Sequence, residues 1–185
     1  MRLVAAAALC IVALAACNRA VKHEPAPVAP SAPVSGFQHE AGFDAQGFYK
    51  PAQPVGSGDL KLTGVAVGAP SDFEAFESGR REEVFGPIVM QFEDIGSPLE
   101  DAENGQRHAV RVEIKPNAYR LAPGEFAFRG QDAKLGEVAF DGAFDTPALA
   151  QAKAGQAEGK PVLSGTLTVG QQKIAGVSFA YQSGD

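Results

Sequence analysis

The chain has few of the residues that carry catalytic, redox and metal chemistry. Its 185 residues include two cysteines and three histidines. Both cysteines, Cys10 and Cys17, lie near the N-terminus, so residues 18–185 offer no disulfide, no thiol nucleophile and no cysteine metal ligand. The histidines, His23, His39 and His108, are too far apart in the sequence to suggest a local zinc motif.

Runs of one charge sign and long apolar runs are also missing. The formal net charge is −6, and lysine and arginine never form a run. Nucleic acid and anionic lipid surfaces are therefore not expected as electrostatic partners. Beyond residue 17, no apolar stretch approaches the roughly 20 residues that a membrane-spanning helix needs.

The motifs of common catalytic sites are absent as well. The sequence contains no G-x-S-x-G elbow, no H-E-x-x-H pair, no Walker loop and no dinucleotide-binding fingerprint. His108 has two interpretations, a general base or a half-exposed histidine at a strand edge, and no nucleophile pattern accompanies it. We therefore predict no catalytic residue and no cofactor, and a hydrolase ranks below the binding functions considered below.

Carboxylates are the remaining candidates for site chemistry. A group of oxygen-bearing side chains lies in and before one loop: Glu93, Asp94, Glu100, Asp101, Glu103 and Asn104. Such side chains suit calcium, but their spacing does not match a calcium-binding loop, so we expect a solvated acidic loop and no metal site. Asp141 and Asp145 would lie roughly 13 Å apart along a strand, which is too far for the carboxylate pair of a glycosidase.

Among the features that are present, the first is the N-terminal segment. Arg2 is followed by an apolar run over residues 3–13 and by the sequence L-A-A-C, which ends at Cys17. This order is typical of a secretory signal, and the apolar run is too short to span a bilayer. The L-A-A-C ending resembles the lipobox of bacterial lipoproteins. The resemblance implies that residues 1–16 are cleaved and that Cys17 becomes the lipidated first residue of the mature protein.

The lipoprotein resemblance also implies a location. Proteins of this kind carry three acyl chains, which anchor them stably in the lipid bilayer. Asn18, where aspartate would signal retention at the inner membrane, points to the outer membrane, with the rest of the chain facing the periplasm of the cell envelope. Residues 17–35 then form the lipid anchor and a disordered Pro/Ala-rich tether, which in an extended polyproline conformation reaches roughly 55 Å.

A segment rich in glycine and aromatic residues follows at residues 36–58. Three glycine–aromatic pairs place Phe37, Phe43, Phe48 and Tyr49 within a dozen or so residues. Disordered linkers are usually poor in aromatic residues, so these rings have two interpretations. They dock as an irregular arm onto the domain that follows, or they recognise a partner in the envelope, a protein or a glycan. We expect His39, which lies among them, to be exposed.

Residues 59–185 have the pattern of a single β-domain. Apolar residues alternate with polar ones in several short segments, among them residues 60–67 with a bulge at Gly64, residues 88–93, residues 119–128 around a Pro-Gly turn, and residues 137–145. The clearest strand is predicted over residues 108–115, with Val110, Val112 and Ile114 facing inward. Residues 162–169 and 173–181 are predicted to form a hairpin.

Two short helices are predicted between these strands. Ser71 with Glu74 indicates a capping box at the start of the first, and Thr146 is the predicted N-cap of the second. The fold class that follows is all-β, an antiparallel sandwich or barrel with two short helices. Sandwich and barrel share the same alternation, so the choice between them stays open.

One segment near the C-terminus carries a second resemblance. The sequence L-S-G-T-L-T-V-G at residues 163–170 resembles the closing hairpin of the polyisoprenoid-binding YceI-like proteins, which are periplasmic lipocalin-like barrels. Two classes of function are therefore open. The first is an envelope lipoprotein that displays a binding or structural module. The alternative is a lipocalin-like carrier of an apolar ligand inside a barrel.

Overall fold

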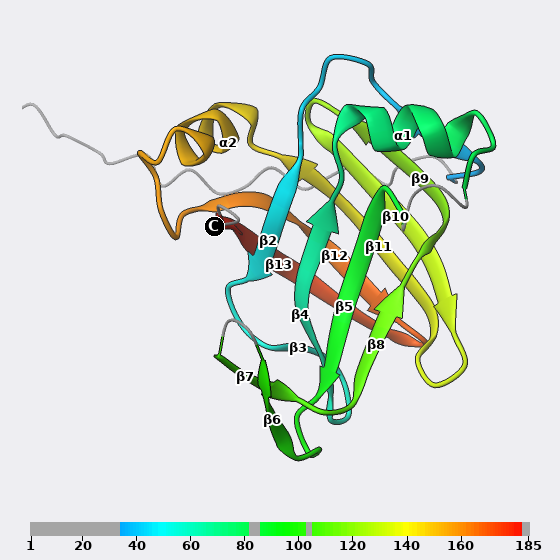
Figure 1. Cartoon of the computed structure of the whole chain (residues 1–185), viewed down its shortest axis with the longest axis vertical. Helices are drawn as coiled ribbons and strands as arrows, with labels where there is room; N and C mark the ends of the chain where they lie inside the picture. The colour runs from blue at the N-terminus through cyan, green and yellow to red at the C-terminus, as the bar shows by residue number, and fades with distance from the viewer. Residues whose placement is uncertain (1–33, 82–85, 103–104, 183–185) are drawn as a thin grey trace, which may run out of the picture.

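The alternation of apolar and polar residues produces an architecture made almost entirely of strands. The computed structural model describes residues 34–81, 86–102 and 105–182. Within these ranges the chain forms one curled sheet of eleven strands, a separate two-stranded sheet and two helices (Figure 1). The predicted all-β class with two short helices is confirmed, and the curled sheet forms a half-barrel. The predicted signal peptide, Cys17 and most of the predicted tether lie outside the described residues.

The strands of the main sheet follow the order β1-β9-β10-β11-β12-β13-β2-β4-β5-β8, and β3 also pairs with β4. Their bounds are β1 Phe37–His39, β2 Gly47–Pro51, β3 Val55–Ser57, β4 Leu60–Val67, β5 Ile88–Asp94, β8 Arg111–Ile114, β9 Pro116–Ala122, β10 Glu125–Asp132, β11 Gly136–Phe144, β12 Pro161–Val169 and β13 Gln172–Gln182. Every pairing is antiparallel except that of β1 with β9, which is parallel. The sheet is therefore mixed, which the sequence did not predict.

The sheet curls until its two halves face each other. A Cβ atom added to Gly130 on β10 would lie 2.5 Å from Ile114 Cγ2 and 2.9 Å from the Lys115 carbonyl oxygen. Glycine therefore allows β10 to pass close to the end of β8, the strand at one edge of the sheet. Figure 1 shows the result: β2, β4, β5 and β8 form the front of the half-barrel, and β9 to β13 form its back.

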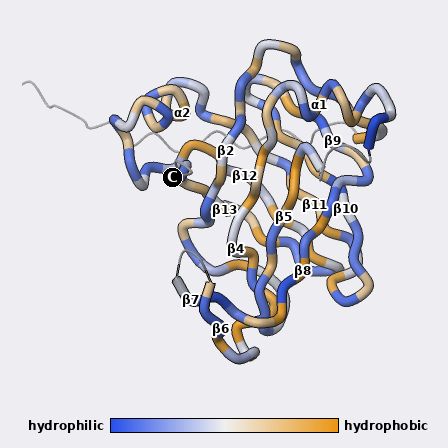
Figure 2. The backbone as a smooth tube through the Cα atoms, viewed as in Figure 1, coloured by the Kyte–Doolittle hydropathy of each residue, from blue (hydrophilic) through white to orange (hydrophobic). Residues whose placement is uncertain are grey.

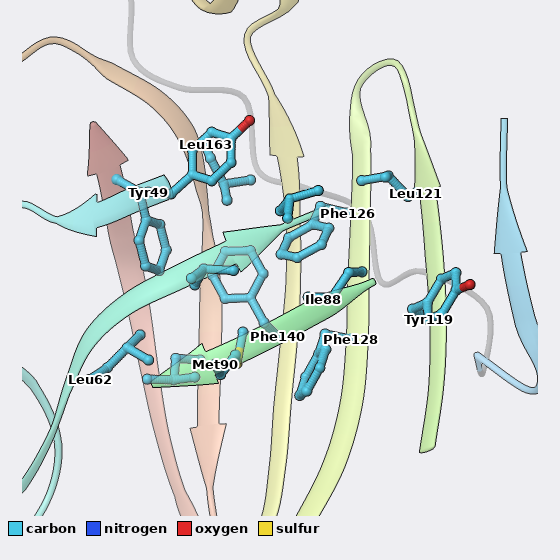
Figure 3. Packing of buried hydrophobic residues seen from close by; sticks show 14 of the residues in the cluster. Tyr49, Leu62, Ile88, Met90, Tyr119, Leu121, Phe126, Phe128, Phe140 and Leu163 are labelled. Atoms are coloured by element: carbon cyan, nitrogen blue, oxygen red, sulfur yellow. The ribbon is translucent and has the colours of Figure 1, made fainter. Parts of the chain in front are cut away.

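Large apolar side chains fill the space between the two halves. The rings of Tyr49, Phe126, Phe128 and Phe140 are fully buried there, together with Met90. Figure 3 shows these side chains converging from front and back strands, and Figure 2 shows apolar residues alternating with polar ones along the strands. Burial of this surface from water is the main driving force of the fold.

Two facing glycines make room for one of these rings. Gly142 on β11 pairs with Gly165 on β12. A Cβ atom at Gly142 would lie 2.5 Å from the Phe140 ring, and one at Gly165 would lie 2.7 Å from the same ring. Phe140 therefore lies flat across both backbones, a position that any larger residue at either glycine would obstruct.

Several sequence predictions are confirmed residue by residue. Leu62, Val65 and Val67 face inward on β4, and the register shifts between Leu62 and Gly64, as expected for a bulge. The C-terminal hairpin consists of β12 and β13, with Gly170 in the turn at a φ of 58°. A left-handed conformation at this turn suits glycine because it has no Cβ atom.

The strand predicted over residues 108–115 is wrong as a single element. The chain forms β6 (Leu99–Ala102) and β7 (Gly105–His108), which make a two-stranded sheet of their own, and then β8 begins at Arg111. Between β7 and β8, the backbone N–H of Ala109 donates to the Pro98 carbonyl, and that of Asp94 donates to the Val110 carbonyl. These bonds turn the chain out of the main sheet, so Val110 is 37% exposed while Ile114 is buried.

Both helices start at a different cap from the one predicted. For α1 (Pro70–Glu77) the N-cap is Ala69, whose backbone N–H donates to the Asp72 carboxylate at 2.8 Å. For α2 (Thr146–Lys153) it is Asp145, whose carboxylate accepts from the Ala148 N–H at 3.0 Å. In each case the carboxylate stabilises free N–H groups and the positive end of the helix.

Residues 36–58 contribute three strands to the sheet. β1 extends the sheet beside β9, β2 lies between β13 and β4, and β3 pairs with β4. The fold thus includes the glycine–aromatic segment. In Figure 1, α1 lies across one end of the half-barrel, α2 lies beside that end, and the β6–β7 hairpin lies at the opposite end.

Candidate binding groove

A groove lies on the outer face of the front strands, along β4. Val65 and Val67 point into the core, so Gly64 and Ala66 face outward. Ala66 leaves a trough between β2 and β5, because Phe48 and Val89, which pair with it on either side, carry larger side chains. Ala66 pairs with Phe48 on β2, and Gly64 pairs with Gln91 on β5. The groove has a volume of about 770 Å³.

Phe48 forms one wall of the groove. Its neighbour Tyr49 points into the core with no exposed surface, so strand alternation turns Phe48 outward, where it is 50% exposed. The described residues contain three other large apolar side chains with comparable exposure, and they lie elsewhere, at Ile95, Leu99 and Val110. A concave surface with an aromatic wall is a common feature of ligand sites.

Polar side chains from distant segments complete the groove. Gln46 precedes β2, Gln91 belongs to β5, Asp72 belongs to α1 and Lys153 ends α2. Neither glutamine side chain hydrogen-bonds another described residue. The groove therefore combines one apolar wall with two amides whose hydrogen-bonding groups are available to a ligand.

An ion pair fixes the upper rim of the groove. Lys153 Nζ lies 2.9 Å from the Asp44 carboxylate and donates to the Asp44 carbonyl oxygen at 3.0 Å. Partial burial raises the pKa of the Asp44 carboxyl, but hydrogen bonds from Lys153 and from the Gln46 backbone N–H outweigh this effect, so the pKa lies below its ordinary value. The pair ties α2 to the segment before β2 and neutralises the charge of Lys153.

The four aromatic residues proposed for partner binding from the sequence do not lie together. Phe48 alone is well exposed. Phe37 and Phe43 are half-buried against the core, where Phe37 meets Phe76 edge-on at 5.0 Å and Phe43 meets Phe144 at 5.5 Å. Tyr49 is fully buried and donates its hydroxyl hydrogen to the Ala45 carbonyl at 2.6 Å.

A second polar cluster joins β1 to α1 and β9, and the sequence did not predict it. His39 Nδ1 lies 3.0 Å from a Glu77 carboxylate oxygen that also accepts the Tyr119 hydroxyl at 2.9 Å. The His39 side chain is 7% exposed and stacks on Phe73 at 5.0 Å, so the expectation that His39 is exposed is wrong. The residues are 38 and 42 positions apart from Glu77, and no local sequence pattern connects them.

This cluster holds the structure together but is closed to ligands. His39 Nε2, the atom through which a general base would act, is buried and has no hydrogen-bond partner among the described residues. Burial raises the pKa of the Tyr119 hydroxyl, and the hydrogen bond to Glu77 raises it further. The Arg81 guanidinium lies 4.7 Å from the centre of the Phe37 ring and 5.2 Å from that of Phe76, next to this cluster.

The other residues considered for chemistry have structural partners. His108 Nδ1 lies 3.0 Å from the Ser97 carbonyl oxygen at the base of the β6–β7 hairpin. Asp141 pairs with Arg129 at 2.7 Å, and Asp145 caps α2. Glu100 pairs with Arg107 across the hairpin at 3.2 Å, while Glu103 and Asn104 lie outside the described residues. Within the described ranges, no three His, Cys, Asp or Glu side chains come together in a way that could hold a metal ion.

Two further findings concern membrane-spanning helices and similar proteins. None of the helices in the described part of the chain is both long enough and apolar enough to cross a bilayer. Comparisons of the chain with protein-family models, with curated protein sequences and with solved structures give no match.

Proposed function

We propose that this protein is a lipoprotein of the bacterial cell envelope that displays its β-domain in the periplasm as a binding module. In this proposal the acylated Cys17 anchors the chain in the lipid bilayer, most simply at the outer membrane, and the Pro-rich tether carries the domain away from the bilayer surface. The groove along β4 is the contact surface for an envelope partner, a protein or a glycan.

The observation that carries the proposal is the exposed ring of Phe48 beside a groove of about 770 Å³. An aromatic wall beside a concavity that also contains a few polar groups is the common composition of a ligand site. The groove also has its own rigid support, since β2, β4 and β5 are central strands and the Lys153–Asp44 pair fixes its rim.

The packed interior favours the outer groove over a cavity for an apolar ligand. A lipocalin-like carrier needs space inside its barrel, whereas here the rings of Phe126, Phe128 and Phe140 occupy the region between front and back strands (Figure 3). A ligand inside would have to displace these side chains from contacts that stabilise the fold.

The anchor is tested by the substitution Cys17→Ala, because no other residue can take the lipid. We expect the wild-type protein to sediment with membranes after a high-salt wash and the variant to remain as a soluble or unprocessed form. Fractionation of cells followed by immunoblotting gives the result. A variant that still resists the salt wash would contradict the lipid anchor.

The groove is tested by photocrosslinking in intact cells. The photoreactive amino acid p-benzoylphenylalanine is placed at position 48, and in a matched control at position 95, since Ile95 is 48% exposed and lies away from the groove. We expect a discrete adduct from position 48 and none from position 95. No adduct at position 48, or the same products from both positions, would show that the groove contacts no specific partner.

A further inference from the structure

The pairing of the strands restricts what the groove can bind. β2 pairs with β13 and β4, β4 pairs with β2 and β5, and β5 pairs with β4 and β8. Their backbone N–H and C=O groups are therefore used within the sheet. A peptide cannot add to these strands as a further strand, which is the usual way in which a sheet captures an extended chain.

The lining of the groove also disfavours an amphipathic helix. A helix docks through several apolar anchors at positions i, i+3 and i+7, and each needs an apolar pocket. The well exposed apolar side chain here is the single ring of Phe48, and Ala66 forms the floor beside it. Val89 lies opposite Phe48 across Ala66 but is only 3% exposed. Tyr181 in the lining is half-buried, so neither side chain forms a deep apolar pocket for a helix anchor, while Gln91 presents an amide.

The charge of the groove disfavours a polyanion. Lys153 is the one cation among the described residues that line the groove, and it is paired with Asp44 at 2.9 Å. Asp72, also in the lining, carries a carboxylate that accepts the backbone N–H of Ala69. A phosphate-rich chain would therefore meet a carboxylate and no available cation.

These features suit an uncharged sugar. A pyranose ring has an apolar face of C–H groups that packs on an aromatic ring, and its equatorial hydroxyl or acetamido groups form hydrogen bonds around its rim. Phe48 offers the ring, and Gln46 and Gln91 offer planar amides that both donate and accept. The volume of about 770 Å³ lies within the range of ligand sites, about 300–1,000 Å³.

We propose that the groove along β4 binds a saccharide chain, with one sugar ring stacked on Phe48 and with its polar groups hydrogen-bonded to Gln46 and Gln91. This inference rests on the proposed function, because it names the ligand of the same groove. It makes the domain a saccharide-binding module in the envelope, where glycan chains lie within reach of a tethered domain.

Isothermal titration of the full-length acylated protein in detergent micelles tests this inference. The probes are chitotetraose, a β-1,4-linked chain of N-acetylglucosamine, and cellotetraose, which has the same linkage but no acetamido groups. We expect saturable binding of chitotetraose. Weaker binding of cellotetraose assigns part of the recognition to the acetamido groups, and equal binding assigns it to the rings and hydroxyls. Both results support a saccharide site.

Variants locate the binding in the groove. Phe48→Ala should weaken binding roughly tenfold, while Phe48→Tyr, which keeps the aromatic face, should retain it. Ala66→Leu fills the floor of the trough beside Phe48 and should abolish binding while the Phe48 ring itself is retained. Ile95→Ala and Ala143→Leu, which alter surface positions outside the groove, are the matched controls. Thermal melts show that each variant is folded.

The outcomes separate this inference from the proposed function. Absence of binding to both saccharides at about 10 mM, or equal affinity of wild type and Phe48→Ala, overturns the saccharide site. If a protein nevertheless crosslinks to position 48, the binding module stands and its ligand is a polypeptide. If neither saccharide binds and position 48 yields no adduct, both proposals fail.

Discussion

Two tyrosine side chains place hydroxyl groups inside the fold. The Tyr49 hydroxyl donates to the Ala45 carbonyl, and the Tyr119 hydroxyl donates to Glu77. Burial raises the pKa of both hydroxyls above the ordinary value. The ionised form of either tyrosine would lose its hydrogen-bond donor and place a negative charge in apolar surroundings, so both groups hold their protons more tightly in the folded state than in the unfolded state.

Stability should therefore fall when the pH rises above about 10, where tyrosines ionise in the unfolded chain. Below this pH both states bind the protons and the stabilisation is complete. Above it the unfolded state binds fewer protons, and each tyrosine removes up to about 1.4 kcal/mol of stability per pH unit. Urea unfolding at pH 8, 10 and 11 gives the slope. Tyr49→Phe and Tyr119→Phe should each be less stable at pH 8 by about 1 kcal/mol, with a shallower decline above pH 10. A decline as steep as that of the wild type would contradict this account.

At the scale of single residues, the sequence predicted inward positions far better than sites. Ile88, Met90 and Phe92 are buried as predicted because alternation and burial have the same physical cause. The adjacent pair Phe48 and Tyr49 shows the limit. Two neighbouring rings on a strand face opposite sides of the sheet. The glycines around Phe48 and Tyr49 interrupt the alternation that indicates a strand, so the sequence did not predict which ring would be exposed. No pattern in the sequence marked Gln46 and Gln91 as residues of a groove.

At the scale of elements, the start of α2 shows how tertiary contacts determine which of two adjacent capping residues becomes the N-cap. Asp145 and Thr146 are both good capping residues and stand next to each other. β11 ends at Phe144, and the Asp145 backbone N–H donates to the Val162 carbonyl, so Asp145 keeps an extended conformation and becomes the cap. Thr146 is left as the first residue of the helix.

This assignment predicts unequal effects of two neighbouring substitutions. Asp145→Ala should lower the free energy of unfolding by about 1 kcal/mol, because the Ala148 N–H loses its acceptor. Thr146→Ala should change it by less than about 0.5 kcal/mol. Asp145→Asn keeps an acceptor and is the matched control. Equal losses for the two alanine variants, measured by chemical denaturation, would show that Thr146 contributes as much to the cap as Asp145 does.

The β6–β7 hairpin shows why element boundaries were harder to predict than elements. The alternation over residues 108–115 is real, but the chain leaves the main sheet after β5 and returns to it only at β8. Where the chain leaves and rejoins the main sheet depends on backbone hydrogen bonds between distant residues, such as the one from the Asp94 N–H to the Val110 carbonyl. Local alternation contains no information about those partners.

At the scale of the whole molecule, the fold depends on strands that come before residue 59. β2 joins β13 to β4 and thereby connects the two halves of the sheet, and Tyr49 on β2 belongs to the core. Removing β2 would expose two strand edges and leave a cavity where Tyr49 packs.

A chain that begins at residue 59 should therefore fail to fold cooperatively, whereas a chain that begins at residue 34 should melt in a single sharp transition. Thermal unfolding followed by near-ultraviolet circular dichroism distinguishes the two, because it reports packing of the aromatic rings. A sharp transition for the shorter chain would mean that residues 59–182 form a core without β2.

The attachment of β1 has a mechanical consequence. β1 contains three residues, pairs only with β9 within the described part of the sheet, and leads to β2, which begins at Gly47. A pull from the N-terminal side would reach β1 first, and the His39 ring nitrogen that lacks a partner would gain one from water on release. Peeling residues 37–46 would give a connection of at most roughly 33 Å and would remove Phe37, Phe43 and Ala45 from their contacts with the core. β1 would thus detach from β9 under tension and pair with it again when the tension ends.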